Sequence, residues 1–132
     1  MQWSELVAQV REHGRYTSDE QTKQVVRLIL SALGGHLSDE VREQVAAQLP
    51  ATAAESLRYQ LPATKPLTGP EFVESVQGRL QGATPATARW DVGSVLSVLA
   101  DVCGDALTGQ VLDDLPPGYA LLFGRAELAS AA

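Results

Sequence analysis

The chain has 132 residues, a length that fits one domain and allows about two-thirds of the unfolded surface to be buried. Its formal net charge of −6 disfavours generic binding to phosphate backbones, and its one cysteine, Cys103, excludes an internal disulfide. Its apolar runs are far too short to span a bilayer and its N-terminus lacks the pattern of a signal peptide, so we expect one globular domain over residues 1–132, in the cytoplasm.

The first half of the chain has the pattern of four helices. Apolar residues spaced three and four apart predict a helix over residues 3–13. A capping-box pattern opens a second helix, residues 19–33, which is apolar around more than half of its circumference and should be buried on several sides. After the Gly34–Gly35 break, residues 38–49 form a capped amphipathic helix that ends at a proline, and residues 51–59 form a short fourth helix.

The second half follows the same order after a proline-containing linker, residues 62–68. Capping and periodicity predict helices over residues 69–81 and 85–103. Two shorter helices follow over residues 105–115 and 119–123. The chain shows no convincing strand alternation, so we expect an all-α fold with eight helices.

The two halves also match residue by residue. A shift of 66 positions, without a gap, aligns 13 identical pairs in the window from Glu5 to Leu57. Roughly one identity in four is well above the few per cent expected by chance, and both halves carry a Leu-Pro stop in the same register. We therefore predict internal repeats 3–61 and 69–127, forming two tandem four-helix pseudo-repeats packed on each other.

No residue pattern indicates catalysis. His13 and His36 belong to different turns and lack metal-ligand spacing, so we interpret them as turn or cap residues. Cys103 aligns with an apolar position and is expected to be a buried packing thiol. The acid pairs Asp39–Glu40 and Asp113–Asp114 lie on polar helix faces and should be solvated. We predict no catalytic, cofactor-binding or metal-binding residues, no cofactor, and no enzyme activity.

Aromatic side chains are the candidate interaction anchors, because aromatic residues dominate interface energetics. They are Trp3, Tyr59, Trp90 and Tyr119. Trp90 aligns with the polar Gln24, so it either packs on the linker or the sister half, which we favour, or serves as an exposed contact. Gly78, Gly93 and Gly109 interrupt the helical pattern of the second half and either allow close helix approach or are tolerated.

The order of a buried aliphatic helix, a capped helix ending in Leu-Pro and a short helix, repeated once, resembles the bacterial family catalogued as domain of unknown function 2267. The residues that carry the resemblance are Val25–Leu33, Leu37–Pro50, Val95–Leu99, Asp113–Pro116 and Leu121–Phe123. The resemblance covers nearly the whole chain. It implies a soluble, helical, intracellular bacterial protein, and it implies no activity.

We expect a non-catalytic protein-interaction or structural module that binds a protein partner or itself, with no role at a membrane. An alternative is a sensor for a small apolar ligand, with a cavity between the halves at Ile29 and Val95. A further alternative is a helix-turn-helix DNA binder whose reading helix, residues 38–49, offers Arg42 and Gln44 to a groove. The surrounding acids make nucleic acid an unfavourable partner.

Overall fold

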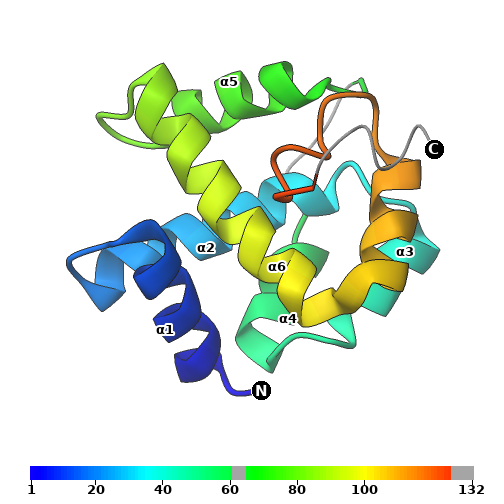
Figure 1. The fold of residues 1–132 in the computed structure, drawn as a ribbon, viewed down its shortest axis with the longest axis horizontal. Helices are drawn as coiled ribbons and strands as arrows, with labels where there is room; N and C mark the ends of the chain where they lie inside the picture. The colour runs from blue at the N-terminus through cyan, green and yellow to red at the C-terminus, as the bar shows by residue number, and fades with distance from the viewer. Residues whose placement is uncertain (61–64, 126–132) are drawn as a thin grey trace.

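The computed structural model describes residues 1–60 and 65–125, and within these ranges all regular secondary structure is helical. The prediction of an all-α fold is therefore confirmed. Parts of the predicted linker 62–68 and the ends of both predicted repeats lie outside the described residues. The helices are α1 (Trp3–Gly14), α2 (Asp19–Gly34), α3 (Asp39–Ala46), α4 (Ala51–Arg58), α5 (Gly69–Arg79) and α6 (Pro85–Asp114) (Figure 1).

The prediction of eight helices is wrong, because the described part of the chain forms six. The predicted helices 85–103 and 105–115 correspond to the two helical segments of α6 (Pro85–Asp114), which meet at a kink at Gly104, where φ is 80°. Glycine adopts this left-handed conformation without a steric penalty. The predicted helix 119–123 is instead a series of turns, flanked by Gly118 and Gly124, which both have a positive φ.

Helix starts keep the predicted offset between the halves. Gly69 begins α5 66 residues after Trp3 begins α1, and Pro85 begins α6 66 residues after Asp19 begins α2. The halves differ at their ends, however, because α4 is a helix and the corresponding segment 117–124 is not. The duplication therefore stays a prediction.

Local capping explains where most helices begin. The side chains of Ser18, Ser38, Thr68 and Thr84 each accept a hydrogen bond from the backbone N–H three residues later, as the sequence predicts. Each such bond satisfies a donor that the first helical turn leaves without a partner, which is typically worth about 1 kcal/mol.

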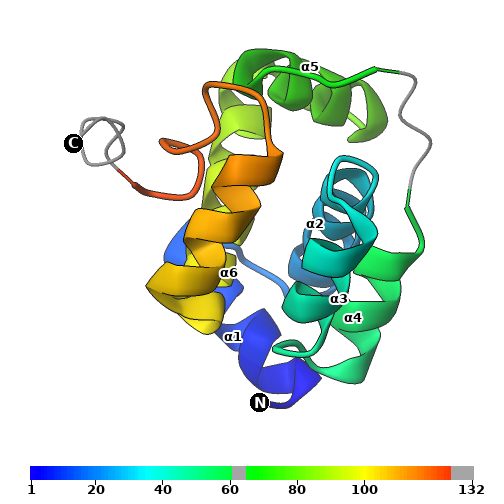
Figure 2. The ribbon, with the colours of Figure 1, turned by 90° about the vertical axis from the view of Figure 1, so that its right-hand side faces the viewer.

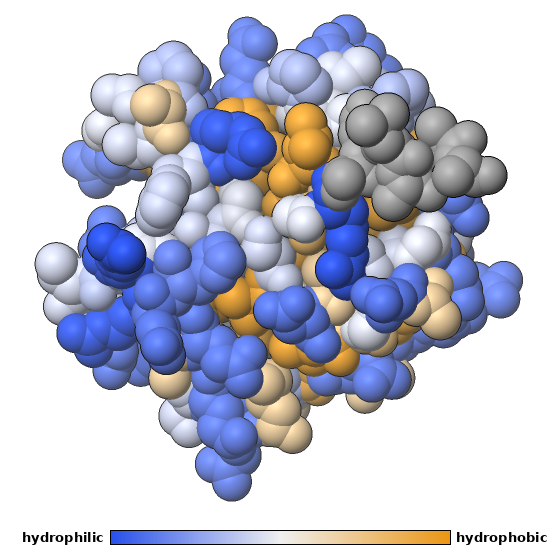
Figure 3. Space-filling view, viewed as in Figure 1, coloured by the Kyte–Doolittle hydropathy of each residue, from blue (hydrophilic) through white to orange (hydrophobic). Residues whose placement is uncertain are grey.

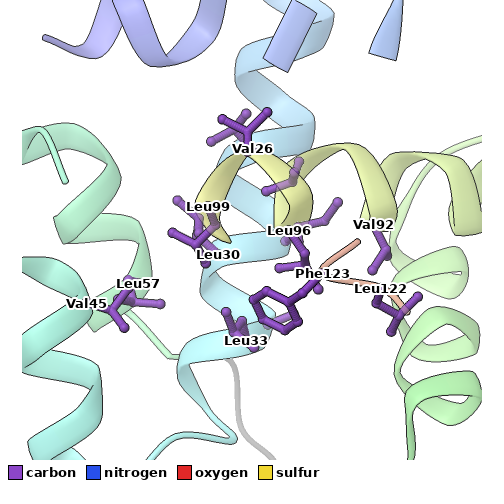
Figure 4. Close-up of a cluster of buried hydrophobic side chains, with 14 of the residues drawn as sticks. Val26, Leu30, Leu33, Val45, Leu57, Val92, Leu96, Leu99, Leu122 and Phe123 are labelled. Carbon is purple, nitrogen blue, oxygen red and sulfur yellow. The ribbon is translucent and has the colours of Figure 1, made fainter. Parts of the chain in front are cut away.

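The helices enclose one hydrophobic core that both halves share. Figure 2 shows α6 on one side and α2, α3 and α4 on the other, with α5 across one end and α1 across the opposite end. Side chains from α2, α6 and the last turns meet between these layers (Figure 4). The central ones are Val26, Leu30, Leu33, Val92, Leu96, Leu99, Leu122 and Phe123, each at most 3% exposed.

One described helix, α6, is long and apolar enough to cross a membrane by length and composition alone. This is weak evidence, because the core helix of a soluble protein passes the same test. Here Val92, Leu96 and Leu99 of α6 are buried against the other helices. The place of α6 in the core thus accounts for part of its apolar character, and the predicted location stays a prediction.

The glycines of the helices give a test of this packing. An added Cβ at Gly109 would meet no atom within 4 Å, so Gly109→Ala should raise the free energy of unfolding by roughly 0.5–1 kcal/mol. Gly34→Ala should instead lower it, because its Cβ would overlap the carbonyl oxygen of Leu57 on α4. Urea unfolding followed by circular dichroism measures both. A stability loss in Gly109→Ala would show that this face of α6 is packed in solution.

Candidate functional site

The predicted aromatic anchors lie in different environments. Trp3 is partly buried against the core, and the guanidinium of Arg27 lies 5.4 Å from its ring centroid. Tyr59, just after α4, is 76% exposed. Tyr119 is buried, and its hydroxyl donates a hydrogen bond to the Leu67 carbonyl at 2.9 Å. Tyr119 is therefore a core residue and is not available as a surface anchor, since its hydroxyl already has a partner within the chain.

Trp90 combines the two roles considered for it. Its indole N–H donates a hydrogen bond to the Gly14 carbonyl at 2.9 Å, while 53% of the residue remains exposed. The Gly14 carbonyl is free to accept because α1 ends there, with Arg15 in the left-handed conformation. One edge of the indole thus fixes α6 to the end of α1, and the rest of the ring faces solvent.

A second hydrogen bond joins the same two regions. The Tyr16 hydroxyl donates to Asp91 Oδ1 at 2.5 Å, across 75 residues of sequence. Burial raises the pKa of Asp91, and the hydrogen bond from Tyr16 offsets this only in part. The pKa of Tyr16 is also raised, first by burial and then by Asp91. We call the Trp90–Gly14 and Tyr16–Asp91 hydrogen bonds the clasp. The sequence places Tyr16 in a turn and gives no sign of its contact with Asp91.

An apolar hollow of about 400 Å³ opens where α5, the start of α6 and the last turns meet. Figure 3 shows apolar side chains gathered at the surface between α5 and these turns. We call it the Leu121 hollow; its lining residues are Gly69, Pro70, Val73, Arg89, Gly118, Leu121 and Leu122. Leu121 is 59% exposed, although it is a large aliphatic residue.

Two glycines allow the backbones beneath this hollow to touch. The Gly69 N–H donates to the Pro117 carbonyl at 3.2 Å, and a Cβ on Gly69 would overlap the Gly118 carbonyl oxygen. Gly118 itself has a φ of 98°, which favours glycine. The start of α5 is thereby held directly against the last turns, and no side chain fills the space above the contact.

Arg89 is the one charged residue among the described residues that line the hollow. It forms no ion pair with another described residue, whereas four other arginines do: Arg11, Arg42, Arg58 and Arg125. Its guanidinium lies along α6 above Gly93, where an added Cβ would be 2.9 Å from Nη1. Gly93 therefore leaves room for the Arg89 side chain, whereas Gly78 and Gly109 face open space.

A second, more polar hollow of about 460 Å³ lies between the α2–α3 turn and the end of α6. Its Asp114 carboxylate accepts hydrogen bonds from the backbone N–H and the hydroxyl of Ser38, so it holds the residue that caps α3. The His36 ring packs on the edge of Phe72 at a centroid distance of 5.8 Å, and burial lowers its pKa. The Asp114 carboxylate is bound to Ser38 and the His36 ring favours its neutral form, so Lys65 is the charged residue of this hollow that pairs with no other described residue.

The described ranges contain no group of three His, Cys, Asp or Glu residues placed to hold a metal ion. Cys103 is half-buried, as a packing thiol should be, and burial raises its pKa to about 11. A thiol with this pKa is protonated at neutral pH and is a poor nucleophile.

The residue on which the DNA-binding alternative depends is occupied inside the protein. Arg42 is 7% exposed, and its guanidinium donates to the carbonyls of Gly34 and Leu37 at 2.9 and 2.6 Å. It also pairs with Asp39 at 2.7 Å. These bonds hold the α2–α3 turn, so Arg42 cannot reach a DNA groove without breaking them.

The seam predicted to hold a ligand cavity is filled. Ile29 and Val95 are 0% and 2% exposed, and the space between the helices there is about 10 Å³. A volume of this size is at the lower limit for a single water molecule. The interpretation of an apolar-ligand cavity between the halves is therefore wrong for this seam.

Comparison with known protein families gives a match over most of the chain. A family model described as "Uncharacterized conserved protein (DUF2267)" matches residues 3–122. No curated protein matches the chain. The family description names no activity, so a function has to be argued from the surface itself.

Asp91 gives the clasp a defined pH dependence. Because burial raises the pKa of Asp91, its stabilising contribution is complete below the unfolded-state pKa and is lost as pH rises through the folded-state pKa. The free energy of unfolding of Asp91→Asn, relative to that of the wild type, should therefore increase when the pH is raised from about 3 to about 7. Tyr16→Phe should enlarge this pH effect in the Asp91 protein, because it removes the hydrogen bond that favours the carboxylate. Urea unfolding at both pH values checks this; a pH-independent difference would contradict it.

Arg42 gives a test of the α2–α3 turn. Arg42→Met should lower the free energy of unfolding by roughly 2–4 kcal/mol, because two carbonyls lose their buried donor and Asp39 loses its partner. Arg58→Met is the matched control, since Arg58 forms its ion pair with Glu43 on the surface and its loss should matter far less. Equal effects of the two substitutions would refute the structural role of Arg42.

Proposed function

The chain belongs to the DUF2267 family of uncharacterized conserved proteins, and we propose that it acts as a non-catalytic protein-interaction module. We place its partner at the Leu121 hollow. A cytoplasmic location without a cofactor is part of the same proposal, and the single cysteine supports a reducing compartment.

The observation that carries this proposal is the exposure of Leu121 beside an apolar hollow. A single exposed leucine needs no explanation, but one that borders a hollow of about 400 Å³ with apolar walls forms a continuous patch. Burying a leucine side chain contributes about 1.5–3 kcal/mol, so covering this patch favours association. Trp90, the residue after Arg89, also exposes half of its surface, but its indole points to the end of α1 and does not line the hollow.

The proposed duplication relates the Leu121 hollow to a difference between the two halves. We propose that a 66-residue unit was copied, and the shared helix starts and the aligned identities support this. In the first half, α4 covers α2, with Gly34 in close contact with the Leu57 carbonyl. In the second half, turns 117–124 replace that helix and border the hollow. The hollow thus borders a segment in which the two halves differ.

A small apolar ligand is a second candidate for the same hollow. Its volume lies within the range of about 300–1,000 Å³ typical of small-ligand sites. We favour a protein because a small ligand inside the hollow would leave the exposed part of Leu121 in water, whereas a protein surface could cover it.

The test compares two exposed apolar residues. Leu121→Asp should abolish association, measured as self-association by light scattering or as a specific partner identified by affinity capture and mass spectrometry. Tyr59→Asp is the matched control, because Tyr59 is also exposed but does not line the hollow. Both variants should keep the wild-type melting temperature. A wild-type chain that is strictly monomeric and captures no specific partner, or equal losses in both variants, would overturn the proposal.

A further inference from the structure

We infer that the partner presents an apolar side chain next to a carboxylate, so that the apolar group enters the Leu121 hollow and the carboxylate pairs with Arg89. This inference rests on the proposed function and names the chemistry that the partner needs. The occupant we propose is a peptide segment of another protein with an acidic residue and an aliphatic or aromatic residue on one face.

The walls of the hollow determine the apolar half of this motif. Val73, Leu121 and Leu122 present aliphatic side chains to it, and Pro70 presents a ring and has no backbone N–H to donate. The backbone N–H of Gly69 is already bonded to Pro117. A polar group placed among these residues would give up its bonds to water with few replacements, so an apolar group is favoured.

Arg89 determines the acidic half. It lines the hollow and forms no ion pair with a described residue, so its guanidinium can offer a carboxylate two parallel N–H donors. Gly93 leaves room for the Arg89 side chain to lie along α6. The net charge of −6 would repel an acidic partner, but salt screens charges beyond about 8 Å in physiological conditions. The nearby guanidinium of Arg89 therefore favours an acidic group in the partner.

Because Arg89 is itself part of the lining, the two partner groups must be neighbours in space. On a helix they would be three or four residues apart, where side chains lie about 5–6 Å from each other. On an extended segment they would be two residues apart, since alternate side chains share a face. Either spacing fits within one short linear peptide.

The experiment uses a displayed library of random dodecapeptides, selected against the full chain and against its variants. We expect wild-type selection to enrich peptides with Asp or Glu at one of these spacings from Leu, Ile, Phe or Met. Synthetic peptides from the selection should bind Arg89→Gln up to about fivefold more weakly and Arg89→Glu about tenfold more weakly than the wild type. A peptide in which Lys replaces the acid should bind Arg89→Glu better than it binds the wild type.

Arg79→Glu is the matched control, because Arg79 is an exposed arginine of α5 that does not line the hollow. This variant should bind the selected peptides with the affinity of the wild type. Peptides that lose binding to Leu121→Asp but show no acidic preference and no Arg89 dependence would overturn the inference and leave the proposed function standing. If the selection yields no peptide whose binding depends on Leu121, both the inference and the proposed function are overturned. Binding of decanoate at the hollow without any peptide binding would identify a small aliphatic acid instead and would also overturn the inference.

Discussion

The constraint on which the structure depends is that α2 has to be covered on nearly every side. Its buried residues include Val25, Val26, Ile29, Leu30 and Leu33, which together leave little of its circumference polar. Each such side chain contributes about 1.5–3 kcal/mol when it leaves water, so an uncovered side would be costly. Helices α1, α4, α5 and α6 all contact α2, and α6 brings in the aliphatic residues of the second half. The halves are consequently parts of one core.

Because the core is filled, a binding site has to lie at the surface. The space between the helices at the centre is about 10 Å³, whereas the Leu121 hollow is about 400 Å³. The hollow exists because the last segment of the chain turns back at Gly118 and packs by its backbone on Gly69 rather than continuing as a helix. Arg89 then gives an otherwise apolar surface one positive charge. A single local departure from helical structure thus creates the feature on which the proposed interaction depends.

Sequence reasoning succeeded where structure is determined locally. The caps at Ser18 and Thr84 follow from residues three apart, and the burial of α2 follows from its apolar periodicity. It failed for the helix count, because the predicted helix 119–123 is a series of turns and the two helical segments on either side of Gly104 are joined across a kink in α6. The hollow and the clasp could not be predicted, because each brings together residues distant in the chain, as with Tyr16 and Asp91. The burial of Tyr119 likewise depends on tertiary contacts that its residue type does not indicate.

Hydrogen exchange measured amide by amide under native conditions tests the shared core most directly. If α2 and α6 form one cooperative unit, the amides of residues 26–33 and 92–99 should both exchange only by global unfolding, with the same free energy of opening. That free energy should equal the one obtained from urea unfolding. Clearly different opening free energies for the two segments would mean that the halves unfold independently, and this would contradict the account.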